Sequence, residues 1–580
     1  MPDKPIPTPD PERIDIDAVA SAVRSGKASM KWLGGFLPAT WDAPERFHKA
    51  LHAHASKRVG GHKSRPGEGY DLYHDTIGVH VGQRRRAFVA ASASGDTDIT
   101  FDNLHHRSAA LSIAWAQMGV APGKSVAIVL PVSVDHVIAL VACLRLGAVV
   151  STVSPDGPTF VQNRLERLQP DHVVTSDKLA RHCGDFAEKR IQFVAPAMTN
   201  TSAPSHWYAS DEPVLRILSP FGDPAGDPVE VCADKLYESL IVAGLFVFAL
   251  DKSDTLAAPG FSPAQFQPHL LLSAFVAGAA YAEMPASDVE ADAKIVSRTG
   301  TTVLGVCRSV RDALVRQGSS NVPKGLRAWF RSLTEKFDIE RWVQFQNIAW
   351  ERKVPGFCIA ASSAASFVHL FSPPAAPNVA ALRVWPAPGA SFALAEIAAG
   401  ELPSLRDAGV YAPLVEGKPA DPSGLPTMIF ARESDGYVFA GSVDLGHDAH
   451  AYPADEVVRV VESHRAVRHA AVVVTSGKYT NDAVVALLVF TDDHRDAEGR
   501  VVFRFTPDDI RALVMREMGP TALPDRIEVF PLRPRIVEGK VDAAYCRDQY
   551  LGGLFHKKAT SELHLLISRL GYILAGPRAG

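Results

Sequence analysis

The chain has 580 residues, several times the usual length of one domain, so we expect two or more hydrophobic cores. Its hydrophobic fraction of 47% and charged fraction of 21% are close to globular averages, which excludes fibrous and wholly disordered proteins. The 60 Lys and Arg residues against 64 Asp and Glu residues give a net charge of −4, so no broad basic surface for a nucleic-acid partner is predicted.

The six cysteines are scattered without a CxxC pair, so we expect neither a disulfide framework nor a metal site, and a reducing compartment fits best. The N-terminus, MPDKPIPTPDPERIDID, is polar where a signal peptide would need an apolar core. The longest apolar runs, 239–250 and 270–282, are shorter than the roughly 18 to 20 residues that span a bilayer. We therefore expect a cytoplasmic protein without a transmembrane segment.

In chain order, residues 1–65 are charged and rich in Pro and His, and we expect them to form an N-terminal extension that packs on the main body. Apolar residues recur at near-3.6 spacing from Phe101 to Ala116, which predicts a helix that ends before Gly119. Next come the predicted strand 125–130, helix 133–147, strand 148–153, helix 159–168 and strand 172–175. Strands that alternate with helices predict parallel βαβ units, hence an α/β fold.

The character of the sequence changes near Asp435-Gly436. A compact α+β pattern follows, with the strand YVFAG, helix 453–464, strands 470–475 and 483–490, helix 507–517 and strand 527–530. We predict a large domain over 66–440, a hinge at 441–444 and a small domain over 445–550. Residues 551–580 are amphipathic and are expected to dock on the body, on another subunit or on a membrane surface.

Several long stretches resemble the adenylate-forming superfamily, and most closely its acetyl-CoA and other acyl-CoA synthetases. The similar stretches are 99–177, 301–318, 325–342, 434–441, 454–473 and 523–542. The resemblance implies a large N-terminal domain with parallel sheets and a small, mobile C-terminal domain. Members of this family join a carboxylate to AMP from ATP, and the small domain then swings so that coenzyme A can attack the acyl-adenylate.

The family's glycine-rich phosphate loop corresponds to LSPFGDPAGDPVEV, 218–231. Gly222 and Gly226 are kept and are the expected cofactor contacts, but most hydroxyls and the lysine are absent. Asp223, Asp227 and Glu230 would instead repel a triphosphate by an energy on the order of several kcal/mol. A turn without function is the alternative interpretation of this segment.

The same comparison shows that this sequence differs from the family at three further nucleotide-binding positions. CIAASSAASFVHLF, 358–371, lacks the glutamate that holds magnesium in the family. Met428, eight residues before Gly436, replaces the aspartate that binds the ribose hydroxyls, and Ser442 replaces an arginine.

Some family positions are retained. Lys540 in PRIVEGKVD matches the catalytic lysine that stabilises developing charge, and it is either an inherited scaffold residue or a retained anion contact. Arg181 matches the first residue of a coenzyme A phosphate-binding segment, and Asp444 matches the hinge. His269 aligns loosely with a histidine beside the acyl pocket, for which a packed or solvent-facing side chain is the simpler interpretation. The triple arginine 84–86 is expected to be a solvated loop.

Two functions follow from this pattern. In the first, the protein is a pseudoenzyme, a non-adenylating binding or regulatory protein that takes an acyl or coenzyme A ligand, or a protein partner through its C-terminal helix. In the second, it is an active acyl-CoA ligase for an unknown carboxylate, with Mg-ATP and coenzyme A as cofactors. No GxSxG, HExxH, Walker or GxGxxG motif offers other chemistry. The four altered nucleotide contacts favour the first function.

Overall fold

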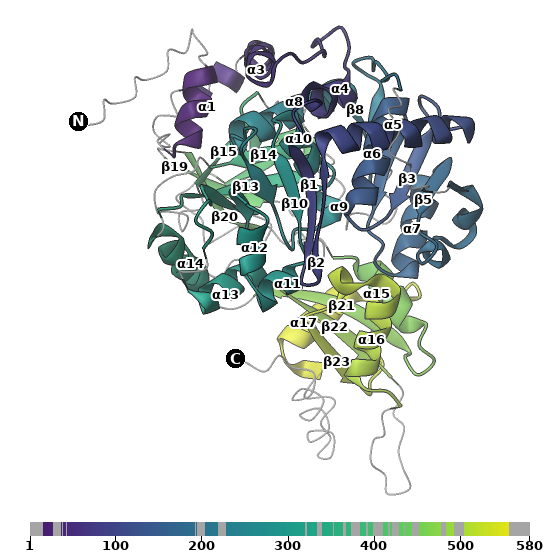
Figure 1. Cartoon of the computed structure of the whole chain (residues 1–580). Coiled ribbons are helices and arrows are strands. Elements are labelled where there is room, and N and C mark those ends of the chain that lie inside the picture. Colours follow the sequence, from purple (N-terminus) through teal and green to yellow (C-terminus); the bar gives the residue numbers. More distant parts are fainter. Residues whose placement is uncertain are drawn as a thin grey trace, which may run out of the picture.

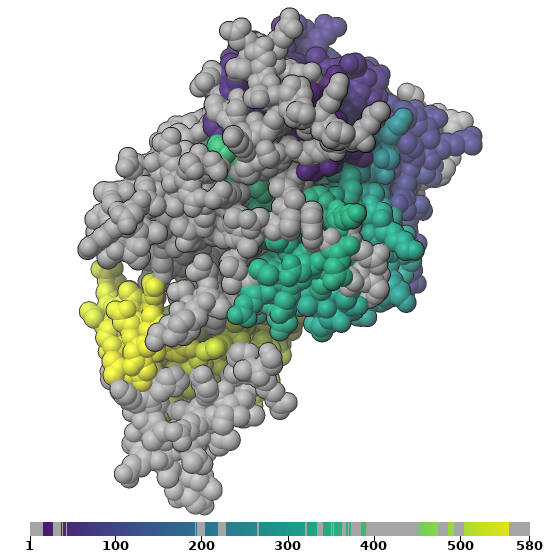
Figure 2. Space-filling view, turned by 90° about the vertical axis from the view of Figure 1, so that its left-hand side faces the viewer, coloured from purple at the N-terminus to yellow at the C-terminus, as the bar shows by residue number. Residues whose placement is uncertain are grey.

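The computed structural model describes the following parts of the chain: 16–26, 36–37, 39–41, 43–191, 193, 203–218, 228–318, 322–332, 339–351, 353–362, 367–372, 383–389, 392–397, 410–415, 418–419, 428–433, 436–442, 452–476, 483–491 and 504–555. Two sheets lie side by side with helices around them, and a smaller C-terminal unit lies below both (Figure 1). In the space-filling view, the N-terminal residues lie at the end of the molecule opposite this unit (Figure 2).

The first sheet has six strands among the described residues, in the order β6-β5-β3-β4-β7-β8. Its strands are β3 (Ser125–Val129), β4 (Val149–Val153), β5 (His172–Thr175), β6 (Arg190–Ile191), β7 (Pro213–Ile217) and β8 (Val229–Cys232). β3 pairs in parallel with both β4 and β5, which confirms the predicted βαβ units. The intervening helices are α5 (Phe101–Gln117), α6 (Val134–Leu146) and α7 (Pro158–Leu168), followed by the 3-10 helix η2 (Ala180–Lys189).

The sequence determines the ends of these helices locally. The Thr100 and Ser133 side chains accept hydrogen bonds from backbone N–H groups in the first turns of α5 and α6. α6 ends at Gly147, whose φ of 73° is in the left-handed region that glycine adopts without strain. Because these signals are local, the predicted bounds agree with the observed ones to within one or two residues.

The larger sheet has 14 strands among the described residues, in the order β16-β17-β19-β20-β15-β14-β13-β12-β11-β9-β10-β1-β2, with β18 on β17. Its strands are β1 (Arg86–Ser92), β2 (Gly95–Thr100), β9 (Thr255–Ala257), β10 (Ala280–Glu283), β11 (Val303–Gly305), β12 (Ala328–Ser332), β13 (Gly356–Ser362), β14 (Phe367–Phe371), β15 (Arg383–Pro386), β16 (Phe392–Ile397), β17 (Val410–Val415), β18 (Lys418–Pro419), β19 (Met428–Glu433) and β20 (Gly436–Ser442). The run from β1 through β10, β9, β11 and β12 to β13 is parallel, while β2 pairs antiparallel with β1. The α/β fold class with parallel sheets is thereby confirmed.

Helix α6 joins the two sheets, since it contacts β1 and β2 on one side and β3 and β4 on the other. Its residues from Val134 to Arg145 are almost all buried except Asp135, because neither side of the helix faces water. The hairpin β1–β2 runs between the two sheets toward the C-terminal unit (Figure 1).

Other helices cover the outer faces. They are α1 (Ile16–Arg24), α3 (Pro44–Val59), α4 (Leu72–Thr76), η1 (Gly78–His80), α8 (Ala233–Ile241), the π-helix η3 (Val242–Val247), α9 (Pro263–Phe266), α10 (His269–Val276), α11 (Ala286–Ala291), α12 (Lys294–Arg298), α13 (Arg308–Gln317) and α14 (Ile339–Glu351). Phe47 and Leu51 of α3 are fully buried in the main core, so the described part of the N-terminal extension packs on the body as expected. No helix in the described residues is long and apolar enough to cross a bilayer.

The triple arginine departs in part from its prediction. Arg84 is exposed, but Arg85 and Arg86 are partly buried and donate hydrogen bonds to the carbonyl oxygens of Gly278 and Thr299. The expectation of a solvated loop is therefore wrong for two of the three residues, because their side chains bind backbone carbonyl groups of the segments beside β1 instead of facing water.

The C-terminal unit contains α15 (Ala454–Glu462), β21 (His469–Ser476), β22 (Ala483–Phe490), α16 (Pro507–Met518), η6 (Pro520–Ala522), β23 (Arg526–Phe530), β24 (Ile536–Val537), β25 (Lys540–Val541) and α17 (Ala543–Leu551). β22 pairs antiparallel with β21 and parallel with β23. Helix α16 packs on α7, and a single apolar cluster includes Phe160 and Val161 of α7 together with Val514 and Met518 of α16. The predicted hinge and most of the predicted terminal helix lie outside the described residues.

Candidate functional site

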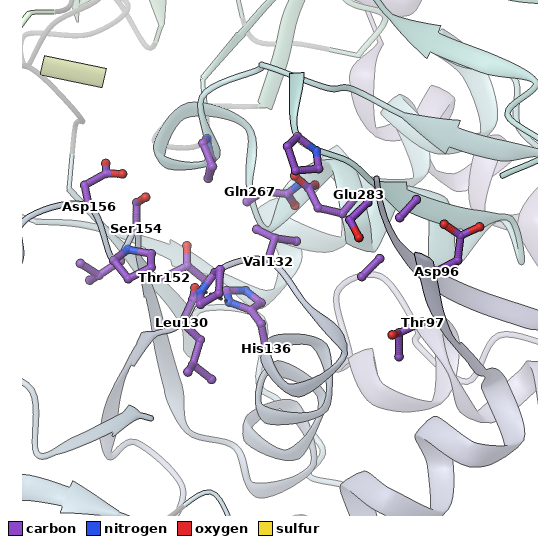
Figure 3. Close-up of a pocket in the computed structure, with 18 of the residues that line it drawn as sticks. Asp96, Thr97, Leu130, Val132, His136, Thr152, Ser154, Asp156, Gln267 and Glu283 are labelled. Carbon is purple, nitrogen blue, oxygen red and sulfur yellow. Dashed lines mark hydrogen bonds between the residues drawn. The ribbon is translucent and has the colours of Figure 1, made fainter. Parts of the chain in front are cut away.

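A cavity of about 690 Å³ opens where strands of both sheets end. Its walls come from the ends of β1, β3, β4 and β10, the start of β2, and residues around α9. Four parallel strands thus direct their carboxyl ends at one space, which is the usual position of a ligand in open α/β sheets. In the close-up, Glu283 and Gln267 lie across the cavity from His136, while Asp96 and Asp156 lie toward opposite ends (Figure 3).

Glu283 is the last residue of β10 and a cavity-lining carboxyl. Its one hydrogen bond in the described structure comes from the Tyr281 hydroxyl at 3.4 Å, and Tyr281 in turn accepts a bond of 2.8 Å from Gln267 Nε2. Burial away from water raises the pKa of the Glu283 carboxyl to about 8. The carboxyl is therefore largely protonated at neutral pH while no ligand is bound.

The other two carboxyls of the cavity have partners. Asp96 on β2 forms a bidentate ion pair with Arg298, in which Arg298 Nη2 lies 2.7 Å from Asp96 Oδ1. Asp156, after β4, accepts a hydrogen bond of 3.1 Å from the Thr521 hydroxyl, and burial raises the pKa of this carboxyl. Of the three acids, Glu283 has the weakest partner.

His136 on α6 adds a neutral acceptor to the wall. The residue is 2% exposed, and its Nδ1 lies 3.3 Å from the Leu130 carbonyl oxygen. Burial lowers the pKa of this imidazole to about 4, so the ring is neutral at neutral pH. Because Nδ1–H donates to the carbonyl, Nε2 carries a free electron pair that is available to a ligand in the cavity.

No Lys or Arg residue lines this cavity in the described structure. Arg164 and Arg216 line a neighbouring cavity of about 30 Å³, and each is paired with a glutamate. Arg164 lies 2.7 Å from Glu456, and Arg216 lies 3.1 Å from Glu230. The main cavity therefore presents hydrogen-bond acceptors and acids without an opposing cation.

Two of the predicted site residues lie outside the cavity wall. Lys540 is exposed on the two-residue strand β25, and Arg181 is exposed on η2. Gly222, Gly226 and Asp444 lie outside the described residues. Neither Lys540 nor Arg181 therefore lies beside the acids of the cavity.

The two altered nucleotide positions on β19 and β20 are neighbours. Met428 pairs with Ser442 in the antiparallel register of these strands. The family resemblance implied an aspartate and an arginine at these positions, which would lie side by side across the ladder. Both substitutions thus affect one place in the sheet.

His269 is packed, which is one of the two simpler interpretations of its sequence position. It begins α10, is fully buried, and stacks on Phe367 with ring centroids 4.8 Å apart. Neither ring nitrogen has a hydrogen-bond partner, and burial lowers the pKa of the imidazole to about 3. The ring therefore acts as a neutral, apolar packing element.

Sequence analysis missed Glu283, His136, Asp96 and Asp156 as a group. One signal was present, because Glu283 ends a buried strand and Asp156 comes soon after another. Polar residues that follow parallel strands converge at one edge of a sheet. The relation between the two sheets, which sets these acids around one cavity, has no local sequence signal.

Comparisons with known proteins agree with this architecture. Residues 79–228 match a family model described as AMP-binding enzyme. The acetyl-coenzyme A synthetase of Alkalilimnicola ehrlichii is 29% identical over 119 residues, which are 19% of this chain and 18% of that protein. The matched stretch thus spans less than a fifth of this relative.

Two solved structures are similar over most of the chain. The o-succinylbenzoate CoA synthetase of Bacillus subtilis, bound with a product analogue, has a TM-score of 0.59 at 15% identity and covers 84% of this chain and 98% of that chain. The amide bond synthetase of Marinactinospora thermotolerans has a TM-score of 0.61 at 15% identity and covers 83% and 99%. At this level of identity, the likeness shows the fold.

One stretch of the chain, residues 79–228, thus matches the AMP-binding enzyme family model, and over most of its length the chain has the fold of the acyl-CoA synthetases. The described residues form a large N-terminal unit and a small C-terminal unit, as this fold implies. Both statements agree with the resemblance seen in the sequence.

Proposed function

We propose that this protein is a non-adenylating, small-molecule-binding protein built on an acyl-CoA synthetase scaffold. The observation that carries the proposal is the composition of the described cavity wall, which has three carboxyls and no Lys or Arg side chain. The altered phosphate loop, magnesium, ribose and arginine positions of the sequence support the same conclusion.

The described wall of the cavity offers no cation to the triphosphate of Mg-ATP. No Lys or Arg side chain is among its described lining residues, and the two nearby arginines already pair with glutamates. The glutamate that holds magnesium in the family has no counterpart in the sequence 358–371. We therefore do not expect ATP to react in this cavity.

The active ligase is tested directly by nucleotide binding and exchange. Calorimetry with Mg-ATP should detect no micromolar binding, and ATP–pyrophosphate exchange should stay at background with a panel of carboxylates. Micromolar ATP binding together with exchange that is lost in Lys540→Ala would contradict the proposal and establish a ligase. Because Lys540 is exposed, this variant should fold normally, so a loss of exchange would report on the lysine itself.

The proposed binding role also extends to partners. We propose that the ligand is coenzyme A or an acyl compound. We also propose that a partner protein docks on residues 551–580. A coenzyme A titration tests the first. A pull-down from the native host that compares the full chain with a chain ending at residue 550 tests the second, and equal recovery of the same proteins by both would argue against a role for this segment.

A further inference from the structure

The chemistry of the cavity wall points to one class of ligand. Its ionisable groups are the carboxyls of Asp96, Asp156 and Glu283 and the His136 ring, whose Nε2 accepts hydrogen bonds. The remaining lining is mostly apolar or hydroxyl-bearing, with Ala91, Leu130, Val132, Pro155 and Pro285 among its members. A ligand that fits this wall combines an apolar body with a group that donates several hydrogen bonds.

Glu283 is the group that lacks a partner of adequate strength. Asp96 is neutralised by Arg298, and Asp156 accepts a hydrogen bond from Thr521, whereas Glu283 has only the 3.4 Å contact from Tyr281. An ionised carboxylate in a poorly hydrated site is costly unless a cation or several donors pair with it. The protein does not supply that cation within the described residues, so a ligand can.

We infer that the cavity binds a primary amine with an apolar body, as its ammonium ion, and that Glu283 is the counter-ion. The volume of about 690 Å³ is in the range of small-molecule sites, which hold drug-sized ligands. An ammonium offers three donors, which match the Glu283 carboxylate and the neutral Nε2 of His136. A carboxylate or phosphate of similar size would find hydroxyl donors such as Thr97 and Ser154, but no Lys or Arg side chain among the described lining residues.

Binding of the amine is coupled to proton release. The protonated Glu283 carboxyl loses its proton as the ammonium arrives, so the carboxylate and the ammonium form an ion pair and one proton passes to the buffer. The groups that face Glu283 are Tyr281 on the same strand, Gln267, Asp96, His136 and Asp156. Asp96 is already ion-paired and the His136 ring is neutral, but burial also raises the pKa of Asp156. The loss of proton release in Glu283→Gln is therefore what assigns the proton to Glu283.

This inference rests on the proposed function, because it assumes that the cavity holds a small ligand. Failure of amine binding would leave the nucleotide tests unaffected, and the detection of ATP exchange would leave the amine test unaffected. The two proposals can therefore fail separately.

The experiment compares three probes that share a phenethyl body on the full chain: phenethylamine, phenethyl alcohol and hydrocinnamate. Calorimetry at about pH 7 should show phenethylamine binding at least about tenfold more tightly than the alcohol, and hydrocinnamate binding more weakly than either. Repeating the amine titration in two buffers of different ionisation enthalpy should give about one proton released per amine bound.

Two variants locate the site. Glu283→Gln should remove the tenfold advantage of the amine and leave the alcohol unchanged, while Asp98→Asn, which removes a carboxylate from an exposed position outside the cavity, should change neither. Val132→Phe should weaken the amine and the alcohol together by filling the cavity.

Several results would overturn the inference: equal binding of amine and alcohol, preference for hydrocinnamate, no amine binding at millimolar concentration, or an amine advantage that persists in Glu283→Gln. If Glu283→Gln does not fold, the ranking of the three probes on the unmodified chain and the effect of Val132→Phe still decide the matter.

Discussion

The end of strand β4 separates two regions of opposite character. On one side, Asp156 lines the cavity, where acids and acceptors face an open space. On the other side, the next residue, Gly157, begins the contact of α7 with the C-terminal unit. There, Arg164 and Glu456 form an ion pair of 2.7 Å whose side chains are only 7% and 11% exposed.

The two regions differ in whether their charged groups are paired and in whether the space between their atoms is filled. At the interface, cation meets anion, the Thr159 hydroxyl donates to Glu517, and the backbone of Glu517 comes so close to Gly157 that no side chain fits. In the cavity, a carboxyl remains nearly without a partner. The polar groups of the interface therefore satisfy one another, whereas the Glu283 carboxyl in the cavity has no strong partner until a ligand supplies hydrogen-bond donors.

The largest expected effect comes from a methyl group at the interface. A Cβ at Gly157 would lie 2.1 Å from the backbone carbonyl of Glu517, so Gly157→Ala should destabilise the docked unit by about 3 kcal/mol. Gly325→Ala is the matched control, since its Cβ would meet no atom within 4 Å. Urea unfolding and hydrogen exchange of α16 measure the effect, and equal behaviour of the two variants would show that the interface is not tightly fixed.

Removal of one ion-pair partner tests whether the interface charges are coupled. Arg164→Ala or Glu456→Ala should each cost about 3 kcal/mol, because either change leaves an uncompensated charge in a buried place. The double variant should cost clearly less than the sum of the two single variants. Lys124→Ala, which breaks the exposed pair with Asp171, should cost no more than about 1 kcal/mol. Strict additivity in the double-mutant cycle would argue against the coupling.

A pH series tests the incomplete pairing of the cavity. The pKa of the Glu283 carboxyl is about 8 in the folded chain, against 4.5 ordinarily, so between these values the folded state keeps a proton that the unfolded state has lost. The contribution of Glu283 to stability is thus full below about pH 4.5 and is lost as pH rises toward 8, with a slope of at most on the order of 1 kcal/mol per pH unit.

Glu283→Gln removes this titration and should therefore show a flatter free energy of unfolding across that window. The difference between the two proteins isolates Glu283, because the other groups around the cavity titrate in both. Parallel pH profiles of the two proteins would mean that Glu283 is already paired or well hydrated, and would weaken the contrast between the two regions.

The smallest effect is expected at Lys540. Its side chain is exposed on β25 and belongs to neither the cavity wall nor the described interface, so Lys540→Ala should change the free energy of unfolding by less than about 0.5 kcal/mol. Thermal unfolding measures this change. A substantially larger loss would show that Lys540 has a structural partner.

The sequence by itself determined the fold class and the helices and strands of two regions, 101–175 and 453–530. Helix α5 begins at Phe101 after a Thr cap, and β3 follows a Pro-Gly turn, because periodicity and capping act within a few residues of each other. It also showed the resemblance to the adenylate-forming superfamily, and residues 79–228 match the AMP-binding enzyme model.

Only the tertiary structure decided where the candidate site lies. Glu283 on β10, Asp96 on β2 and His136 on α6 meet because α6 packs between the two sheets and aligns the ends of their strands. No cation pairs with Glu283 within the described residues, and Lys540 is exposed on β25 of the C-terminal unit, although the sequence singled out Lys540 and not Glu283. Local patterns determine which element a residue belongs to, but its burial and its charge partners depend on contacts between segments far apart in the chain, and these set the chemistry of the cavity.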